Sequence, residues 1–238
     1  MCKPKMLHII FPALSSWIYL KISKKCFQGI SPRFIKYFSI IHNSVLHLFS
    51  SYVFCNLLLT MYLNGITARR QFYFQIEQVD KIVFLFYLSK YYEYIDTFLI
   101  YAKKKEPIFL QKFHHLGAVF IWHLGYVYKF DGIVFASMLN SGVHSFMYLY
   151  YLLSIIKTNY IDINKLKQYK IYLTSLQLTQ LGYGFYALPY YYYKLETTQN
   201  KIIIWVCDIY IFILIVLFVQ FMVKSYFSRK SDKEKYIV

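Results

Sequence analysis

Residues 202–224 read IIIWVCDIYIFILIVLFVQFMVK, a run in which nearly every side chain is apolar. A helix of this length, rising about 1.5 Å per residue, reaches across the roughly 30 Å hydrocarbon core of a bilayer. Long apolar runs of the same kind recur along the chain, which is 58% hydrophobic and 22% aromatic, with a mean hydropathy of +0.37. This composition is too apolar for an ordinary globular domain and predicts an integral membrane protein.

Seven segments are expected to span the membrane as helices. They lie at about 7–22, 38–61, 81–103, 108–127, 133–156, 171–193 and 202–224. The chain has no repeat of fixed period and no linker long enough to divide it, so we expect one domain over residues 1–238, with a basic cytosolic tail at 225–238. The predicted fold class is all-α, a polytopic bundle of seven transmembrane helices.

The basic residues are distributed unequally between the predicted loops. The formal net charge is +16, from 27 Lys and Arg against 11 Asp and Glu. In a seven-span arrangement eighteen of the basic residues fall on one side and eight on the other, while Lys90 lies within a span. Because loops rich in Lys and Arg stay in the cytosol, we expect a lumenal N-terminus and a cytosolic C-terminus. The bases then face anionic membrane lipids, and nucleic acid is not an expected partner.

Four polar clusters interrupt the predicted spans, and within each cluster the side chains recur every three or four residues. The clusters are Lys90, Glu93, Asp96 and Thr97; Gln111, His114 and His115; His144, Met147, Tyr148, Tyr150 and Tyr151; and Thr174, Gln177 and Gln180. This spacing places each cluster on one face of its helix. The helix rise puts all four in the cytosolic half of the bundle, where polar groups usually face a bundle interior or a wet cavity. We therefore expect one shared site.

The clusters can also be interpreted as purely structural, with no role in catalysis or binding. Gln177 and Gln180 can hydrogen-bond neighbouring helices, and Lys90 with Glu93 can form a buried structural ion pair. The tyrosines of the third cluster are more often packing residues. Four further histidines have no patterned partner and are interpreted as structural: His8, His42, His47 and His123.

The adjacent histidines His114 and His115, with His144 available from another helix, offer bases and nucleophiles that titrate near neutral pH. Three patterned histidines are too few for a di-iron site, and a single zinc ion would need a fourth ligand such as Asp96. The cysteines are scattered without a CxxC pair, so neither a zinc site nor a disulfide framework is indicated: Cys2, Cys26, Cys55 and Cys207. We expect no bound metal.

In their order along the chain, the clusters resemble the motifs of the ELO family of very-long-chain fatty acid elongases. The first cluster matches KxxExxDT, the third HxxMYxYY and the fourth TxxQxxQ, and Asn140 and Ser141 before His144 are also similar to the family. The resemblance covers residues 80–226. One position departs from the common pattern, because the HxxHH box begins here with Gln111, as it does in some members. An amide can hydrogen-bond but cannot act as a base, so Gln111 is expected to orient a partner.

The resemblance implies a 3-ketoacyl-CoA synthase, which condenses a long-chain acyl-CoA with malonyl-CoA to 3-ketoacyl-CoA, carbon dioxide and CoA, with no cofactor. An imidazole of His114 or His115 would attack the thioester, and the malonyl carbanion would then attack the acyl-imidazole. The residues implied as catalytic are His114, His115, His144, Asp96 and Gln177, with Asp96 the expected imidazole partner. Those implied as substrate-binding or orienting are Lys90, Glu93, Thr97, Gln111, Asn140, Met147, Tyr148, Tyr151, Thr174 and Gln180.

The family also implies a setting in the endoplasmic reticulum membrane. The acyl chain would occupy a tunnel through the bundle, and the CoA phosphates would meet lysines at the cytosolic mouth: Lys103, Lys104, Lys105, Lys112, Lys165 and Lys167. The ketoacyl-CoA reductase, dehydratase and enoyl reductase of the elongation cycle, and a second copy of the chain, are the implied protein partners.

Two other classes of function remain open at this stage. A seven-helix transporter of lipids or small molecules would also carry intramembrane polar residues, although it would more often show helices broken by glycine or proline in paired positions. A non-catalytic subunit of an elongation complex could keep the fold without the activity. The sequence leaves open the preferred acyl chain length and unsaturation, and which histidine is the nucleophile.

Overall fold

Eight α-helices, with short 3₁₀ and π-helical turns between them, build the part of the chain described by this computed structural model, residues 5–65, 72–156, 163–195 and 197–227. The helices are α1 (Lys5–Lys21), α2 (Pro32–Asn64), α3 (Glu77–Tyr92), α4 (Tyr94–Ala102), α5 (Phe109–Val127), α6 (Asp131–Ile155), α7 (Ile163–Ala187) and α8 (Thr198–Met222). No strand occurs in these ranges, which confirms the all-α prediction. Cys2 and the tail beyond Phe227 lie outside the described residues.

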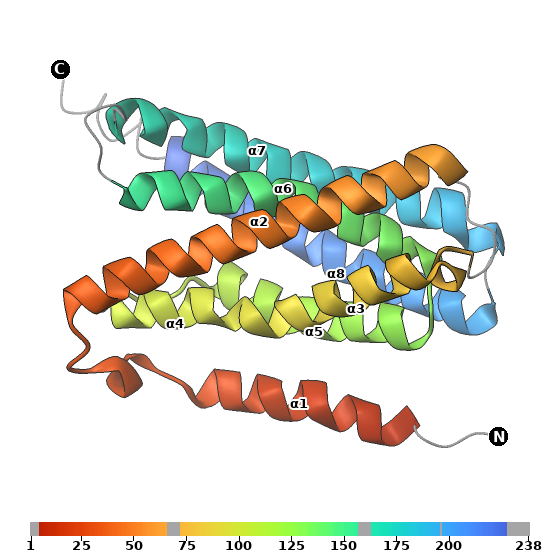
Figure 1. Ribbon diagram of the computed structural model, residues 1–238, viewed down its shortest axis with the longest axis horizontal. Helices are drawn as coiled ribbons and strands as arrows, with labels where there is room; N and C mark the ends of the chain where they lie inside the picture. The colour runs from red at the N-terminus through yellow and green to blue at the C-terminus, as the bar shows by residue number, and fades with distance from the viewer. Residues whose placement is uncertain (1–4, 66–71, 157–162, 196, 228–238) are drawn as a thin grey trace.

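The helices run roughly along one long axis, and the chain reverses direction between successive helices except from α3 to α4 (Figure 1). α3 and α4 follow one another end to end, so that the eight helices form seven rods, one for each predicted span. The start of α1 and the end of α8 lie at opposite ends of the bundle, as an odd number of passes requires.

The rod made of α3 and α4 corrects the prediction of one continuous helix over residues 81–103. The two helices meet at Glu93, where the amide of Asp96 donates to the Glu93 carbonyl three residues back, at 3.0 Å, and not to the residue four back. This tighter turn interrupts the α-helical ladder. It places the break inside the first polar cluster.

The longest helix, α2, begins and ends at residues suited to those positions. Ser31 caps its start by accepting a hydrogen bond from the Phe34 amide at 3.2 Å, Pro32 occupies the first turn, and Gly65 follows its end with a φ of +81°. α2 packs along α6, and Ser51 and Ser145 hydroxyls bond across this contact at 2.7 Å. The pair forms one side of the bundle (Figure 1).

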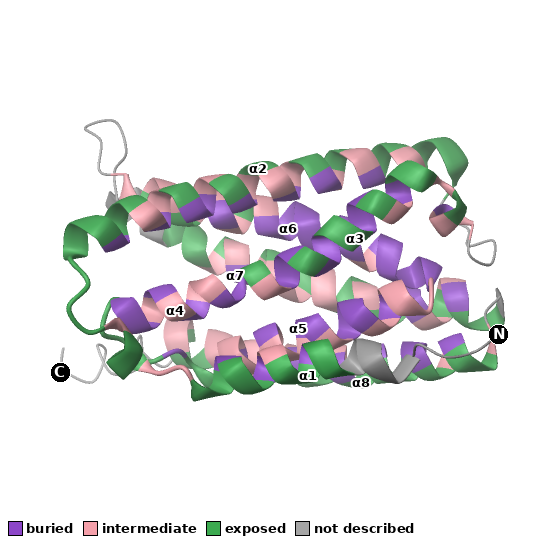
Figure 2. Ribbon diagram, turned by 60° about the horizontal axis from the view of Figure 1, so that its bottom comes forward, coloured by how far each residue is buried: buried purple, intermediate pink, exposed green. Residues whose placement is uncertain are grey.

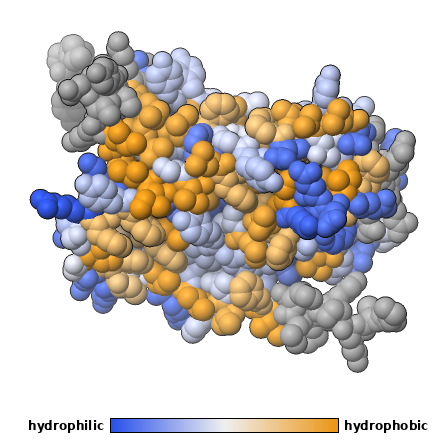
Figure 3. Space-filling model, viewed as in Figure 1, coloured by the Kyte–Doolittle hydropathy of each residue, from blue (hydrophilic) through white to orange (hydrophobic). Residues whose placement is uncertain are grey.

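Much of the exterior of the bundle is apolar, whereas several charged and polar side chains are buried inside it. Large apolar side chains such as Leu48, Tyr62 and Ile209 are 60% or more exposed. Figure 3 shows apolar residues over much of one face, and Figure 2 shows the buried positions on the inward sides of the helices. Lys90 and Glu93, by contrast, are almost completely buried. This arrangement is typical of a protein that has lipid as its solvent.

Two helical segments are long and apolar enough to cross a membrane by themselves, Pro32–Asn64 and Thr198–Phe227. The second contains the run from which the fold was predicted. α5, α6 and α7 each carry one of the polar clusters.

Candidate active site

The structure brings side chains of all four polar clusters to one place. The first cluster lies where α3 meets α4, the second in the first two turns of α5, the third in α6 and the fourth in α7. Members of all four line a cavity of about 560 Å³: Asp96, Gln111, His114, His115, His144, Met147, Tyr148, Tyr151, Thr174 and Gln177. The clusters, far apart in the sequence, therefore share one compartment.

Lys90 and Glu93 form a buried ion pair behind the wall of this cavity. Lys90 Nζ lies 2.7 Å from Glu93 Oε1 and also donates to Asn140 Oδ1 at 2.9 Å. The ammonium group is 4.0 Å from the ring centroid of Phe86 and 4.8 Å from that of Trp122. Lys90 and Glu93 are 1% and 2% exposed and do not line the cavity, so they would not touch a ligand in it. They influence the cavity through the residues they contact, Asn140 and His144.

His144 connects that ion pair to the cavity. Its Nδ1 lies 3.5 Å from Glu93 Oε1, and the residue itself lines the cavity. The contact is too long for a good hydrogen bond, but a carboxylate at this distance favours a proton on the imidazole nitrogen that faces it. The opposite nitrogen, Nε2, is then available to a group in the cavity. Glu93 is thus the carboxylate partner of a site histidine.

Asp96 has a different partner from the one expected, which corrects the sequence-based assignment. Its two carboxylate oxygens accept hydrogen bonds from His42 Nε2 at 2.9 Å and from the Tyr148 hydroxyl at 2.7 Å. Neither His114 nor His115 is bonded to it. His42, interpreted as a structural residue without a partner, therefore belongs to the wall of the site, and it comes from α2, which carries none of the four clusters.

His114 and His115 differ in their surroundings, although they are adjacent in α5. The ring of His114 lies 6.3 Å from that of His144, centroid to centroid, and its Nδ1 is 3.2 Å from the hydroxyl of Tyr210. The His115 ring lies toward the tyrosines Tyr19 and Tyr94, and its Nδ1 has no hydrogen-bond partner within the described part of the chain. His114 therefore faces the polar network of α6, whereas His115 faces α1 and α4.

Gln111, which stands at the first position of the histidine box, donates from Nε2 to Thr97 Oγ1 at 3.4 Å. The Thr97 hydroxyl is also bonded to the Tyr19 hydroxyl at 2.8 Å. The amide therefore contacts a hydroxyl of the first cluster, which is the kind of orienting contact its chemistry allows. It also lines the cavity.

The fourth cluster closes the cavity from α7. Gln177 Nε2 lies 3.6 Å from the Met147 sulfur, and the Thr174 hydroxyl is 3.1 Å from that of Tyr226. Gln180, one turn further along α7, lines a second cavity and not the first. The glutamines of this cluster thus lie at two successive levels of the bundle.

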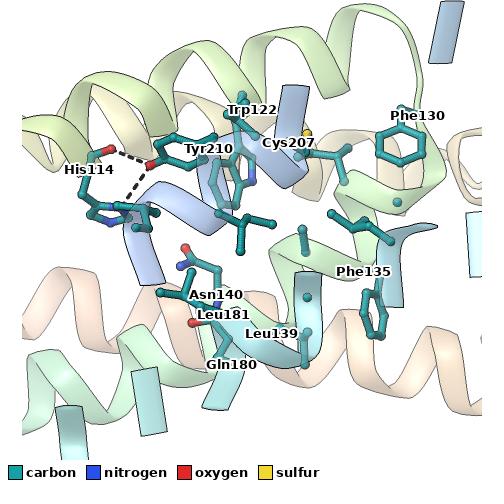
Figure 4. A pocket seen from close by; sticks show the side chains of 18 residues that line it. His114, Trp122, Phe130, Phe135, Leu139, Asn140, Gln180, Leu181, Cys207 and Tyr210 are labelled. Atoms are coloured by element: carbon teal, nitrogen blue, oxygen red, sulfur yellow. Dashed lines mark hydrogen bonds between the residues drawn. The ribbon is translucent and has the colours of Figure 1, made fainter. Parts of the chain in front are cut away.

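The two cavities differ in chemical character, since charged and polar side chains line only the larger one to any great extent. The larger one includes Lys103, Lys105 and Lys170, while Lys104 and Lys112 do not line it and the side chains of Lys165 and Lys167 lie outside the described part. The smaller one, about 50 Å³, is lined mostly by apolar side chains, among them Phe130 and Phe135 (Figure 4). His114 lines both, so the two spaces meet at this residue.

A model of the ELO (GNS1/SUR4) family matches residues 4–234, almost the whole chain. The chain belongs to this family. The resemblance of its motifs to ELO proteins is thereby confirmed, and it extends upstream of residue 80, to the helices that carry no cluster.

The curated relatives of this ELO chain include proteins named as fatty acid elongases. "Fatty acid elongase sre1" of Dictyostelium discoideum is 28% identical over 95% of this chain and 87% of its own length. "Very long chain fatty acid elongase 1" of mouse is 29% identical over 93% and 82%. "Fatty acid elongase 6" of Leishmania major is 28% identical over 78% of this chain, which spans about half, 51%, of that protein's own length.

Two residues at the site of this ELO chain were missed by the sequence analysis, His42 and Tyr210. They lie in α2 and α8, the helices long and apolar enough to cross a membrane by themselves, and outside the four clusters. A single polar group in such a run is itself a signal, because it requires a partner from another helix. Which partner it meets depends on how the helices are rotated, and the sequence does not give this.

Proposed function

We propose that this protein is a 3-ketoacyl-CoA synthase that lengthens a long-chain acyl-CoA by two carbons with malonyl-CoA. The seven rods would cross the endoplasmic reticulum membrane, with the N-terminus in the lumen and the C-terminus in the cytosol. Family membership, the names of the relatives and the apolar exterior support this proposal. The cavity of about 560 Å³ lies within the range of sites for small molecules and cofactors.

The observation that carries the proposal is the position of His114 between a cavity that lysines and polar side chains help to line and a smaller one that is almost entirely apolar. Lys103, Lys105 and Lys170 line the larger cavity and would bind the phosphates of CoA. The smaller cavity would accept the start of the acyl chain. A thioester that joins these two parts of one substrate would then lie at His114, which favours His114 over His115 as the nucleophile.

The first half of the proposed reaction transfers the acyl group to the enzyme. The Nε2 lone pair of His114 attacks the thioester carbonyl, a carbon–nitrogen bond forms, and the carbon–sulfur bond breaks with its electron pair on sulfur. The CoA thiolate takes up a proton from the medium, and we assign the relay of this proton to His144, whose Nδ1 lies 3.5 Å from Glu93. CoA leaves, and the acyl group remains on the imidazole.

The second half extends the chain. Malonyl-CoA loses carbon dioxide, and the electron pair of the broken carbon–carbon bond forms a thioester enolate. The enolate carbon attacks the acyl carbonyl, and the imidazole of His114 leaves as the new carbon–carbon bond forms. Gln177 and Asn140 have amide N–H groups at the cavities and are proposed to stabilise the oxyanions. No proton has to be removed from carbon, because the loss of carbon dioxide itself generates the nucleophile.

The test is incorporation of radiolabelled malonyl-CoA into a 3-keto product two carbons longer, with purified protein. His114→Ala should abolish product formation, and His115→Ala should leave a measurable rate. Equal activity in the wild type and both variants would refute a histidine nucleophile. No activity of the wild type with any acyl-CoA would favour a non-catalytic subunit, and substrate flow without turnover in liposomes would favour transport. Because a 3-keto product must be reduced and dehydrated, the reductases and dehydratase of the cycle are the proposed partners.

A further inference from the structure

Tyr210 of α8 contacts His114 at two atoms, and the two contacts together determine where protons lie. The Tyr210 hydroxyl donates to the main-chain carbonyl of His114 at 2.9 Å. The same oxygen is 3.2 Å from His114 Nδ1. Figure 4 shows the hydroxyl held between the carbonyl and the ring.

A phenol has one proton, and a carbonyl oxygen can only accept. The proton of Tyr210 therefore points to the carbonyl, and the hydroxyl offers only a lone pair to the ring. The hydrogen bond with Nδ1 then requires that Nδ1 carries a proton. In a neutral imidazole the other nitrogen, Nε2, is left unprotonated.

The close packing of α5 and α8 fixes the phenol in this position. Gly117 lies one turn beyond His114, and a Cβ atom there would lie 2.1 Å from Cε2 of Tyr210. The ring occupies the space that a side chain would otherwise fill. The ring also stacks on Phe113, with the ring centroids 5.7 Å apart. Tyr210 is 8% exposed, so water has little access to replace its hydroxyl.

We infer that Tyr210 is a positioning residue that holds His114 in the Nδ1–H tautomer, so that Nε2 presents its lone pair for attack on an acyl thioester. The inference rests on the proposed function for the acyl group and deepens it by choosing the attacking atom. His115 has no equivalent contact, because its Nδ1 is unpartnered among the described residues. After attack at Nε2 the ring carries a positive charge, and Nδ1–H still donates to the phenol oxygen. The same hydrogen bond thus persists from the free enzyme to the acyl-enzyme.

The kinetic test compares Tyr210→Phe with a matched variant, Tyr87→Phe. Tyr87 also presents its hydroxyl to a buried histidine, His123 Nδ1, at 3.0 Å, but neither residue lines either of the two cavities described above. Both changes remove one hydroxyl and keep the ring. The quantity measured is the first-order release of CoA from acyl-CoA without malonyl-CoA, which reports acylation alone. We expect about a tenfold slower release in Tyr210→Phe, the effect of losing one hydrogen bond in the reacting state, and an unchanged rate in Tyr87→Phe.

Equal rates in wild type and Tyr210→Phe would overturn the inference, and so would equal slowing by both variants, since that would be a general effect on packing. A second measurement needs neither turnover nor a folded variant of Tyr210. Two-bond proton–nitrogen spectra of wild-type protein with ¹⁵N-histidine, with the His114 signals identified from His114→Asn, should show a protonated Nδ1 and an unprotonated Nε2. The opposite pattern would refute the inference. Absence of CoA release in wild-type protein would instead count against the proposed function, and the tautomer would still be measured.

Discussion

Removal of one charge from the Lys90–Glu93 pair should destabilise the protein strongly. Lys90 is 1% exposed, and in Glu93→Gln its ammonium group loses the carboxylate 2.7 Å away. Only neutral acceptors remain, the new amide oxygen at position 93 and Asn140 Oδ1. An uncompensated buried charge of this kind costs about 3–5 kcal/mol. For a chain of this size each kcal/mol lowers Tm by roughly 2–4 °C, so a fall of about 10 °C is expected.

The double variant Lys90→Met with Glu93→Leu separates packing from function. Replacing both charges by apolar groups removes the desolvation penalty with the ion pair, so that Tm should return to within about 3 °C of wild type. Elongation activity should stay low in this variant, because His144 has lost the carboxylate 3.5 Å from its Nδ1. Stability would recover while catalysis would not.

The assay is thermal unfolding in detergent micelles, followed by thiol or tryptophan fluorescence, next to the elongation assay. Lys81→Met is the control, because Lys81 forms a 2.6 Å ion pair with Glu77 in the same helix, where the two side chains are 69% and 83% exposed. That change should cost less than about 1 kcal/mol. A Tm for Glu93→Gln equal to that of the control, or a double variant as unstable as the single one, would refute this view of the pair.

Two further perturbations test the lysines that line the larger cavity and the histidine that holds Asp96 beside it. Replacing Lys103, Lys105 and Lys170 by Ala should raise KM for acyl-CoA about tenfold at low salt, with little change in kcat. Raising the ionic strength should reduce the difference in KM, because salt screens the contacts between lysines and phosphates. A changed kcat at constant KM would contradict a role of these lysines in binding. His42→Phe should lower kcat and cost about 1–3 kcal/mol of stability, because one carboxylate oxygen of Asp96 loses its hydrogen-bond donor. The control is His47→Phe, which removes a 2.9 Å hydrogen bond to the Ser145 carbonyl away from the cavity and should affect stability alone.

The rods could be predicted from the sequence because their length is set by apolar runs. The segments predicted at 108–127 and 133–156 are helices at Phe109–Val127 and Asp131–Ile155. The prediction started α7 at 171, whereas the helix begins at Ile163, since its first turns are polar and add nothing to an apolar run. For α2 the start signal was present in the sequence, as Ser31 followed by Pro32, but hydropathy alone placed it at 38.

Spacing within a helix shows which side chains share a face, and this was enough to group the clusters. It does not give the rotation of one helix against another. The bond from His42 to Asp96 joins residues 54 apart, and that from Tyr210 to His114 joins residues 96 apart. Neither pair has a pattern in the sequence, because each is made by the packing of two rods.

The most direct test of His114 as the nucleophile is to locate the acyl group on the enzyme. Purified protein is incubated with acyl-CoA without malonyl-CoA, digested at mildly acidic pH to preserve the adduct, and the modified residue is identified by tandem mass spectrometry. The proposal predicts one acyl group on His114, absent from His114→Asn and lost from the wild type when malonyl-CoA is added. An adduct on His115 or on a cysteine, or product formation with no enzyme-bound acyl group, would contradict it.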